Sequence, residues 1–221
     1  MNYQPTDIIF FGLSGGNYDV SVRDANGCIY EETILVPEPP LIVVDLGQDV
    51  ELELGGSMML EAIVNTTDSL AYSWSSNPGD SSMSCLDCPT PIITPVTTTT
   101  YTVTVEDTSG CTATDQIVVR LDKNRNVFIP NVFTPNGDGR NDEFYVYAGI
   151  GVERIKTFLV YDRWGSKLFE VTNVQPNDAS IGWDGKFRGQ DVQAGVYVFF
   201  IEIEFADGLV FPYKGDLTLI R

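Results

Sequence analysis

A short loop between Thr134 and Asp142 carries the residues whose types and spacing best suit metal chemistry. Asn136, Asp138 and Asp142 place side-chain oxygens along a glycine-containing loop, and calcium prefers oxygen ligands in such loops. The first and last ligand positions of an EF-hand-type loop would fall on Thr134 and Tyr145, however, and neither residue is a carboxylate. Two interpretations stay open: a calcium site formed by Asn136, Asp138 and Asp142, or a loop in which Asx turns satisfy the same side chains.

Three cysteines are candidates for a disulfide. Cys85 and Cys88 form a C-x-x-C pair, but no second pair and no histidine completes a zinc site. Pro89 begins an extended stretch where a thioredoxin-like motif would need a helix, so a redox role is not expected. In an oxidising compartment Cys85 pairs with Cys88, or one of the two pairs with Cys111, and both pairings stay open. Cys28 has no evident partner.

The sequence contains no histidine, which narrows the chemistry that it can perform. Serine or cysteine nucleophiles activated by histidine are excluded, and so is the commonest general base. With 31 acidic residues some carboxylate pair is always available, but no local spacing singles one out. We therefore expect a protein that is not an enzyme and has no small-molecule substrate.

The acidic charge is unevenly distributed along the chain. Residues 1–40 carry six acids and one base, residues 41–122 twelve acids and one base, and residues 123–221 thirteen acids and eleven bases. An acidic front half repels nucleic acid and anionic membrane surfaces, so neither is an expected partner. The change in composition predicts a domain boundary near residues 121–126. The N-terminal residues lack the basic and apolar regions of a signal peptide, which favours a fragment of a longer exported chain.

Alternation of apolar and polar residues dominates the sequence, and helical periodicity is almost absent. Residues 196–205 predict one long strand, with one apolar face and a second face that changes from apolar to acidic. Short strands separated by Gly, Pro, Asn and Asp are typical of β-sandwiches or barrels. We therefore predict an all-β fold of tandem immunoglobulin-like antiparallel β-sandwiches, in which Trp74, Trp164 and Trp183 anchor the cores.

An internal repeat organises the front half. The pattern Y-x-V-x-V-x-D-x-x-G-C begins at Tyr18 and again at Tyr101, with the same offsets. Each copy predicts a strand, a tight turn and the start of a return strand. The first copy, with the preceding Gly12–Asn17, resembles the repeats of SprB-type gliding adhesins. The unit from residue 41 to residue 122 resembles the PKD or immunoglobulin-like modules of such proteins, on the segments 72–74, 85–89 and 97–101.

Residues 127–221 contain a series of specific motifs. They are VFIPNVFTPNGDGRND from Val127, YDRWG from Tyr161, GWDG from Gly182, AGVY from Ala194 and YKGDLTLIR from Tyr213. Together these motifs closely resemble the gliding-motility-associated C-terminal domain, the type B sorting domain of the type IX secretion system. The resemblance implies export across an outer membrane, retention at the cell surface, and recognition by a SprA-like translocon and a PorP/SprF-like outer-membrane protein.

The sequence thus predicts three units: a truncated adhesin repeat (1–38), a PKD or immunoglobulin-like sandwich (39–122) and a sorting domain (124–221). The expected function is protein recognition in a secreted, adhesin-like surface protein. The alternative is a carbohydrate-binding or adhesive module, which two exposed coplanar rings at Trp164 and Trp183 would favour. The near-neutral last unit suits a surface that meets a protein, and its candidate recognition residues are Lys167, Lys186, Arg188, Lys214 and Arg221.

Overall fold

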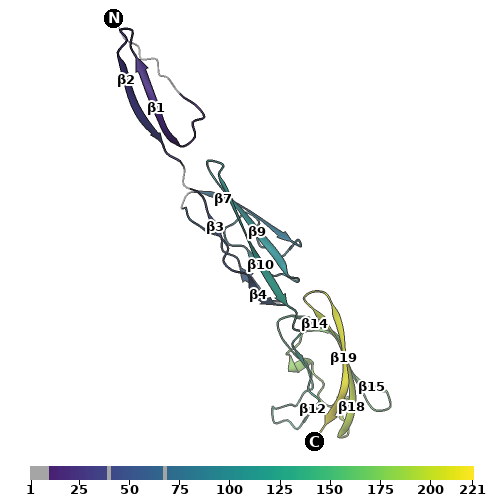
Figure 1. Cartoon of the computed structure of the whole chain (residues 1–221). Coiled ribbons are helices and arrows are strands. Elements are labelled where there is room, and N and C mark those ends of the chain that lie inside the picture. Colours follow the sequence, from purple (N-terminus) through teal and green to yellow (C-terminus); the bar gives the residue numbers. More distant parts are fainter. Residues whose placement is uncertain (1–9, 39–40, 67–68) are drawn as a thin grey trace. The chain divides into compact units, whose positions relative to one another are not determined.

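The computed structural model describes residues 10–38, 41–66 and 69–221 (Figure 1). Contacts divide the chain into two compact units, Met1–Val43 and Val44–Arg221. In the described parts the fold is all-β, as predicted, and the one helical element is the 3-10 turn η1 (Ala179–Ile181). No helix among those residues is long and apolar enough to cross a membrane. The predicted N-terminal segment before residue 10 and the predicted boundary at residue 39 lie outside the described residues.

The described part of the first unit is a β-hairpin. Strand β1 (Gly16–Arg23) pairs antiparallel with β2 (Ile29–Val36), and Tyr18 lies opposite Ile34. The apolar side chains of Ile29 and Leu35 are 60% and 68% exposed. The alternating pattern that begins at Tyr18 therefore forms the predicted strand and turn. Both faces of this two-stranded ribbon remain partly exposed among the described residues.

The second unit begins with a β-sandwich whose main sheet has the strand order β4-β10-β9-β7. Two short antiparallel pairs, β3–β6 and β5–β8, complete it. Its buried side chains include Trp74, Tyr101, Val103 and Ile93, so Trp74 anchors the core as predicted. The strands are β3 (Val44–Asp45), β4 (Val50–Glu53), β5 (Met58–Met59), β6 (Ile63–Val64), β7 (Leu70–Asn77), β8 (Ile92–Ile93), β9 (Thr99–Asp107) and β10 (Thr112–Asp122).

A second β-sandwich follows, built on a five-stranded sheet with the order β12-β19-β18-β14-β15. The predicted long strand is β18, which pairs antiparallel with both β14 and β19. Two further antiparallel pairs, β11–β13 and β16–β17, belong to this part of the chain. Its strands are β11 (Val127–Phe128), β12 (Val132–Phe133), β13 (Tyr147–Ala148), β14 (Val152–Tyr161), β15 (Lys167–Val174), β16 (Lys186–Phe187), β17 (Gln190–Asp191), β18 (Gly195–Phe205) and β19 (Val210–Leu219).

Leu54, which follows β4, joins the two sandwiches. Its side chain is 1% exposed and belongs to the cluster of buried side chains that forms the core of the second sandwich. Gly55 has φ +82°, and a Cβ at this position would collide with the carbonyl oxygen of Ile150. A Cβ on Gly151 would lie 2.9 Å from the carbonyl oxygen of Leu54. We call these four residues the Leu54 joint; its close backbone contacts require glycine at both positions.

Candidate functional site

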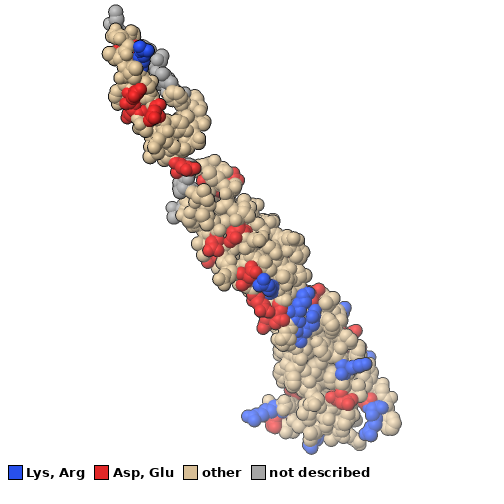
Figure 2. Space-filling view, viewed as in Figure 1, with Lys and Arg blue, Asp and Glu red and all other residues tan. Residues whose placement is uncertain are grey.

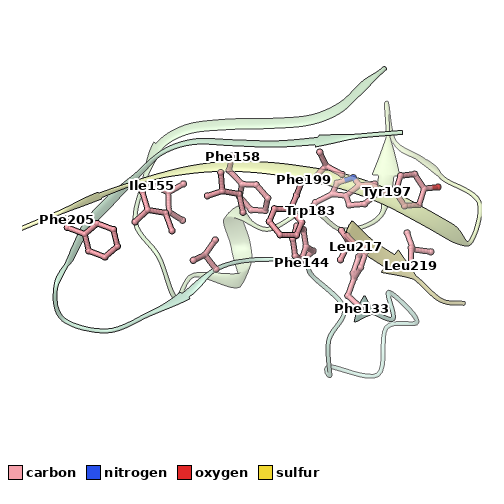
Figure 3. Close-up of a cluster of buried hydrophobic side chains, with 14 of the residues drawn as sticks. Phe133, Phe144, Ile155, Phe158, Trp183, Tyr197, Phe199, Phe205, Leu217 and Leu219 are labelled. Atoms are coloured by element: carbon pink, nitrogen blue, oxygen red, sulfur yellow. The ribbon is translucent and has the colours of Figure 1, made fainter. Parts of the chain in front are cut away.

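Aromatic side chains from the C-terminal motifs form the core of the second sandwich (Figure 3). Trp183 is 1% exposed, and its indole N–H donates to the Lys186 carbonyl oxygen at 2.9 Å. Its ring centroid lies 5.4 Å from that of Phe133 and 5.1 Å from that of Tyr197. Trp183, one of the two motif tryptophans that could stack on a ligand, is therefore the core anchor that the sequence predicted.

The YDRWG motif forms the turn between β14 and β15. The Asp162 carboxylate accepts hydrogen bonds from the backbone N–H groups of Ser166 and Trp164, both at 2.8 Å. The Gly165 N–H donates to the Asp162 carbonyl oxygen at 3.1 Å, and Gly165 has φ +82°. The hydrogen bond from Ser166 is the main cause that lowers the pKa of the Asp162 carboxyl. This turn is fixed by its own side chain and backbone.

The same hydrogen bonds occur in two other turns of the chain. Asp24 accepts from Asn26 and Cys28, and Asp107 accepts from Ser109 and Cys111, all at 2.8–2.9 Å. All three turns share the spacing D-x-x-G, so the sequence repeat that was predicted for two turns extends to a third. Asparagine, serine or tryptophan occupies the position two residues after the aspartate. The turn therefore does not require an aromatic residue there.

Trp164 lies in solvent with 83% of its side chain exposed, so its predicted role as a core anchor is wrong. The physical reason is the turn: the third residue of D-x-x-G donates its backbone N–H to the aspartate, and this residue is exposed in all three turns. Trp164 borders a shallow cavity of about 220 Å³ between this turn and the segment Val192–Tyr197 that leads into β18. Arg163 lies 5.9 Å from the centre of its ring.

The five basic recognition candidates lie in different surroundings. Lys167 forms an ion pair with Glu170, Lys186 with Asp184 at 3.5 Å, and Arg221 with Asp191 at 3.1 Å. Arg188 has φ +53° and lies over the Phe187 ring at 5.0 Å. Among the described residues no ion pair to Lys214 is formed. Figure 2 shows basic side chains gathered over the second sandwich and acidic ones over the parts before it. The structure does not bring the five candidates into one cluster.

The Thr134–Asp142 loop is held by hydrogen bonds from its own backbone. The Asp142 carboxylate accepts from the N–H groups of Gly137 at 2.6 Å and Gly139 at 2.7 Å. Asp138 accepts from Arg140, and Asn136 accepts from Asp138. The Gly137 hydrogen bond is the main cause that lowers the pKa of the Asp142 carboxyl. These contacts have the form of the Asx-turn alternative. Within the described ranges no three His, Cys, Asp or Glu side chains are grouped to hold a metal.

We expect the melting temperature of the protein to be the same in excess EDTA as in millimolar calcium. The reason is that backbone N–H groups already occupy the oxygens that calcium would need. Differential scanning calorimetry at both conditions measures this directly. An Asp142→Asn variant is the control, since it weakens the loop whether or not a cation is bound. A melting temperature that falls with EDTA in the wild type alone would contradict the Asx-turn interpretation.

Of the two cysteine pairings that the sequence left open, the structure contains the disulfide between Cys85 and Cys88. Cys111 and Cys28 are free and exposed. The indole N–H of Trp74 donates to the Cys88 carbonyl oxygen at 2.8 Å, and the Trp74 N–H donates to that of Leu86 at 2.9 Å. The disulfide loop is therefore attached to the core tryptophan of the first sandwich.

Comparisons with solved structures give only distant likenesses. A nucleoside hydrolase-related protein from Saccharophagus degradans is 18% identical with a TM-score of 0.32, over 38% of this chain and 26% of its own. The eight N-terminal immunoglobulin domains of Down syndrome cell adhesion molecule are 14% identical with a TM-score of 0.36, over 94% and 31%. The SGBP-B protein of Bacteroides ovatus is 11% identical with a TM-score of 0.32, over 95% and 48%. The chain thus spans less than half the length of each.

No curated protein matches the sequence significantly. The model of the CHU_C type IX secretion signal domain, however, matches residues 127–218. This range covers the second sandwich from β11 to the last residue but one of β19, including the Trp164 turn and the Trp183 core. Such a domain requires contact with the secretion machinery and belongs to secreted, surface-exposed proteins. Residues 127–218 therefore match the type IX secretion signal domain, and such a signal implies a secreted, surface-exposed protein.

Proposed function

We propose that the chain is part of an adhesin-like surface protein and that its second sandwich is read, already folded, by a SprA-like translocon. A PorP/SprF-like outer-membrane protein then holds it at the cell surface. The observation that carries this proposal is Trp164, a large aromatic side chain held in solvent by a rigid turn that does not need it. Exposed tryptophans of this kind are enriched among the residues that dominate protein–protein binding energies.

We further propose that the protein acts by recognition alone, without catalysis. Of the described carboxyl groups with a lowered pKa, those of Asp142, Asp162 and Asp178 accept hydrogen bonds within their own turns. The fourth, Asp80, accepts hydrogen bonds from Ser82 and from the Tyr101 hydroxyl. Their pKa values thus have a structural cause. The alternative of sugar binding has less support, since Trp183 is buried and cannot pair with Trp164 as a stacking platform.

Replacing Trp164 with serine is expected to reduce surface display of a reporter fused to the full chain by about tenfold or more, which corresponds to the loss of a typical hot spot. Serine is the residue at the equivalent position of the Asp107 turn, so the turn should stay intact. Whole-cell immunofluorescence and protease accessibility in a bacterium with the secretion system measure display.

Leu209→Ser is the matched control. Leu209 is an exposed apolar residue, 50% accessible, in the β18–β19 turn at the other end of the same sheet. Circular dichroism and thermal melts should show both variants folded. Normal display of Trp164→Ser, or equal loss in both variants, would count against recognition through Trp164. Normal display with residues 124–221 deleted would count against the sorting function itself.

A further inference from the structure

The face of the five-stranded sheet that points away from the core has an apolar centre. The side chains of Phe158, Val160, Phe199 and Ile201 point inward and are buried. Their neighbours Leu159 and Tyr161 on β14, and Val198 and Phe200 on β18, therefore point outward. Tyr161 lies opposite Val198, and Leu159 lies opposite Phe200, so the four form one contiguous group. Val198 remains 41% exposed. The outward face of such a sheet is ordinarily polar.

Charged residues flank this apolar centre on both neighbouring strands. On β15, Lys167 lies opposite Tyr161 and Glu170 lies opposite Leu159. On β19, Asp216 lies opposite Val198 and Lys214 lies opposite Phe200. We call these four residues the charged rim. Across the sheet from β15 to β19, one row of residues thus begins at the positive Lys167 and ends at the negative Asp216. The next row begins at the negative Glu170 and ends at the positive Lys214.

This arrangement of charges is complementary to itself. Consider two copies that pack these faces together about a twofold axis. If the axis runs along the strands, Asp216 of the second copy lies over Lys167 of the first, and Lys214 of the second copy lies over Glu170 of the first. If the axis runs across the strands instead, Glu170 of the second copy lies over Lys167 of the first, and Lys214 of the second copy lies over Asp216 of the first. Both arrangements place opposite charges together and apolar centre on apolar centre. Isologous dimers need such a self-complementary surface, and two sheets packed face to face place their side chains within contact distance.

From this pattern we propose that the outward face of the five-stranded sheet is a homodimerisation surface, whose occupant is the same face of a second copy of the chain. An apolar centre with a polar rim is the usual composition of protein interfaces. Other macromolecules would have to supply a matching charge pattern, whereas a second copy has it by construction. The small apolar centre implies weak association, with dissociation constants of about 0.01–1 mM, as in the smallest transient interfaces.

Sedimentation equilibrium of the full chain over this concentration range tests the proposal. We expect a concentration-dependent dimer for the wild type, and association weakened by about tenfold or more in Val198→Glu and Lys214→Glu. Lys186→Glu makes the same charge change on β16, away from this face, and should dimerise as the wild type does. Thermal melts establish that each variant is folded.

Two double variants then identify the axis. Lys214→Glu with Glu170→Lys restores attraction only for the axis along the strands, because the two changed residues then face each other. Lys214→Glu with Asp216→Lys restores it only for the axis across the strands. Recovery of dimerisation in one double variant and not in the other supports the proposal. A wild type that stays monomeric, single variants that dimerise normally, or recovery in neither double variant would overturn it.

Discussion

Replacing Leu54 with alanine should destabilise the sorting domain by about 2–5 kcal/mol, the usual cost of removing a buried leucine side chain. Leu54 lies more than 70 residues before the matched range 127–218, but its side chain packs in the core of that domain. Its loss leaves a cavity beside Gly151, whose close approach to the Leu54 backbone limits relaxation. The stable sorting domain therefore includes a residue of the sandwich before it.

Hydrogen exchange measured by mass spectrometry locates the effect. In Leu54→Ala we expect faster exchange in β14 and β18 of the second sandwich. Leu60→Ala is the matched control, since Leu60 is 2% exposed but lies outside the cluster that contains Leu54. Its exchange should increase in β7 and β9 instead. Unchanged protection of β14 and β18 in Leu54→Ala would show that the Leu54 joint does not stabilise the sorting domain.

Asp207→Ala is expected to cost about 3–5 kcal/mol, because it leaves a largely enclosed arginine without its counter-charge. Asp207 is 5% exposed and lies 2.5 Å from the Arg125 guanidinium. Arg125 itself lies 5.0 Å from the centre of the Phe205 ring and 4.7 Å from that of Phe211. The Arg125 Nε is buried, and no described residue forms a hydrogen bond with it. The linker between the sandwiches is thus fixed to the β18–β19 turn by the largely buried Arg125–Asp207 ion pair, and the more exposed Lys123 lies 3.7 Å from the same carboxylate.

Urea denaturation gives the free energy of unfolding, with an unchanged m-value showing that the folded state is comparable. Glu204→Ala is the control: it breaks the ion pair with Arg154, whose side chain is 45% exposed, and should cost about 0–1 kcal/mol. Arg125→Met combined with Asp207→Ala should recover most of the loss, since no charge then remains buried. Equal effects of Asp207→Ala and Glu204→Ala would contradict this account.

Local patterns in the sequence predicted the strands and turns well. The alternation in residues 196–205 correctly predicted β18, and the repeated pattern that contains D-x-x-G correctly predicted two hydrogen-bonded turns, at Asp24 and Asp107. The exposure of Trp164 was missed although its motif has the same spacing, because tryptophan near an apolar strand was interpreted as a core residue. Comparing the Asp162 motif with the Asp107 repeat would have placed Trp164 in solvent.

Features that depend on contacts between distant segments could not be predicted. Nothing near Leu54 indicates that its side chain packs in a core formed by residues 133–219, and the backbone contact of Gly55 with Ile150 is equally hidden. The apolar outward residues Val196, Val198 and Phe200 were visible in the alternation. Their alignment with Leu159 and Tyr161, however, depends on strand order and register, which sequence patterns leave open.

The parallel strand pairs within the second unit lead us to expect resistance to mechanical unfolding. In the first sandwich β4 runs parallel to β10, and in the second β12 runs parallel to β19. Each pair joins an early strand of its sandwich to the last one, so tension between the two ends pulls the paired strands past each other. Their hydrogen bonds are then loaded in shear and must break together, which raises the force needed compared with unzipping a hairpin bond by bond. Resistance to pulling is governed by the rate of unfolding, so we expect both sandwiches to unfold slowly when tension acts between their two ends.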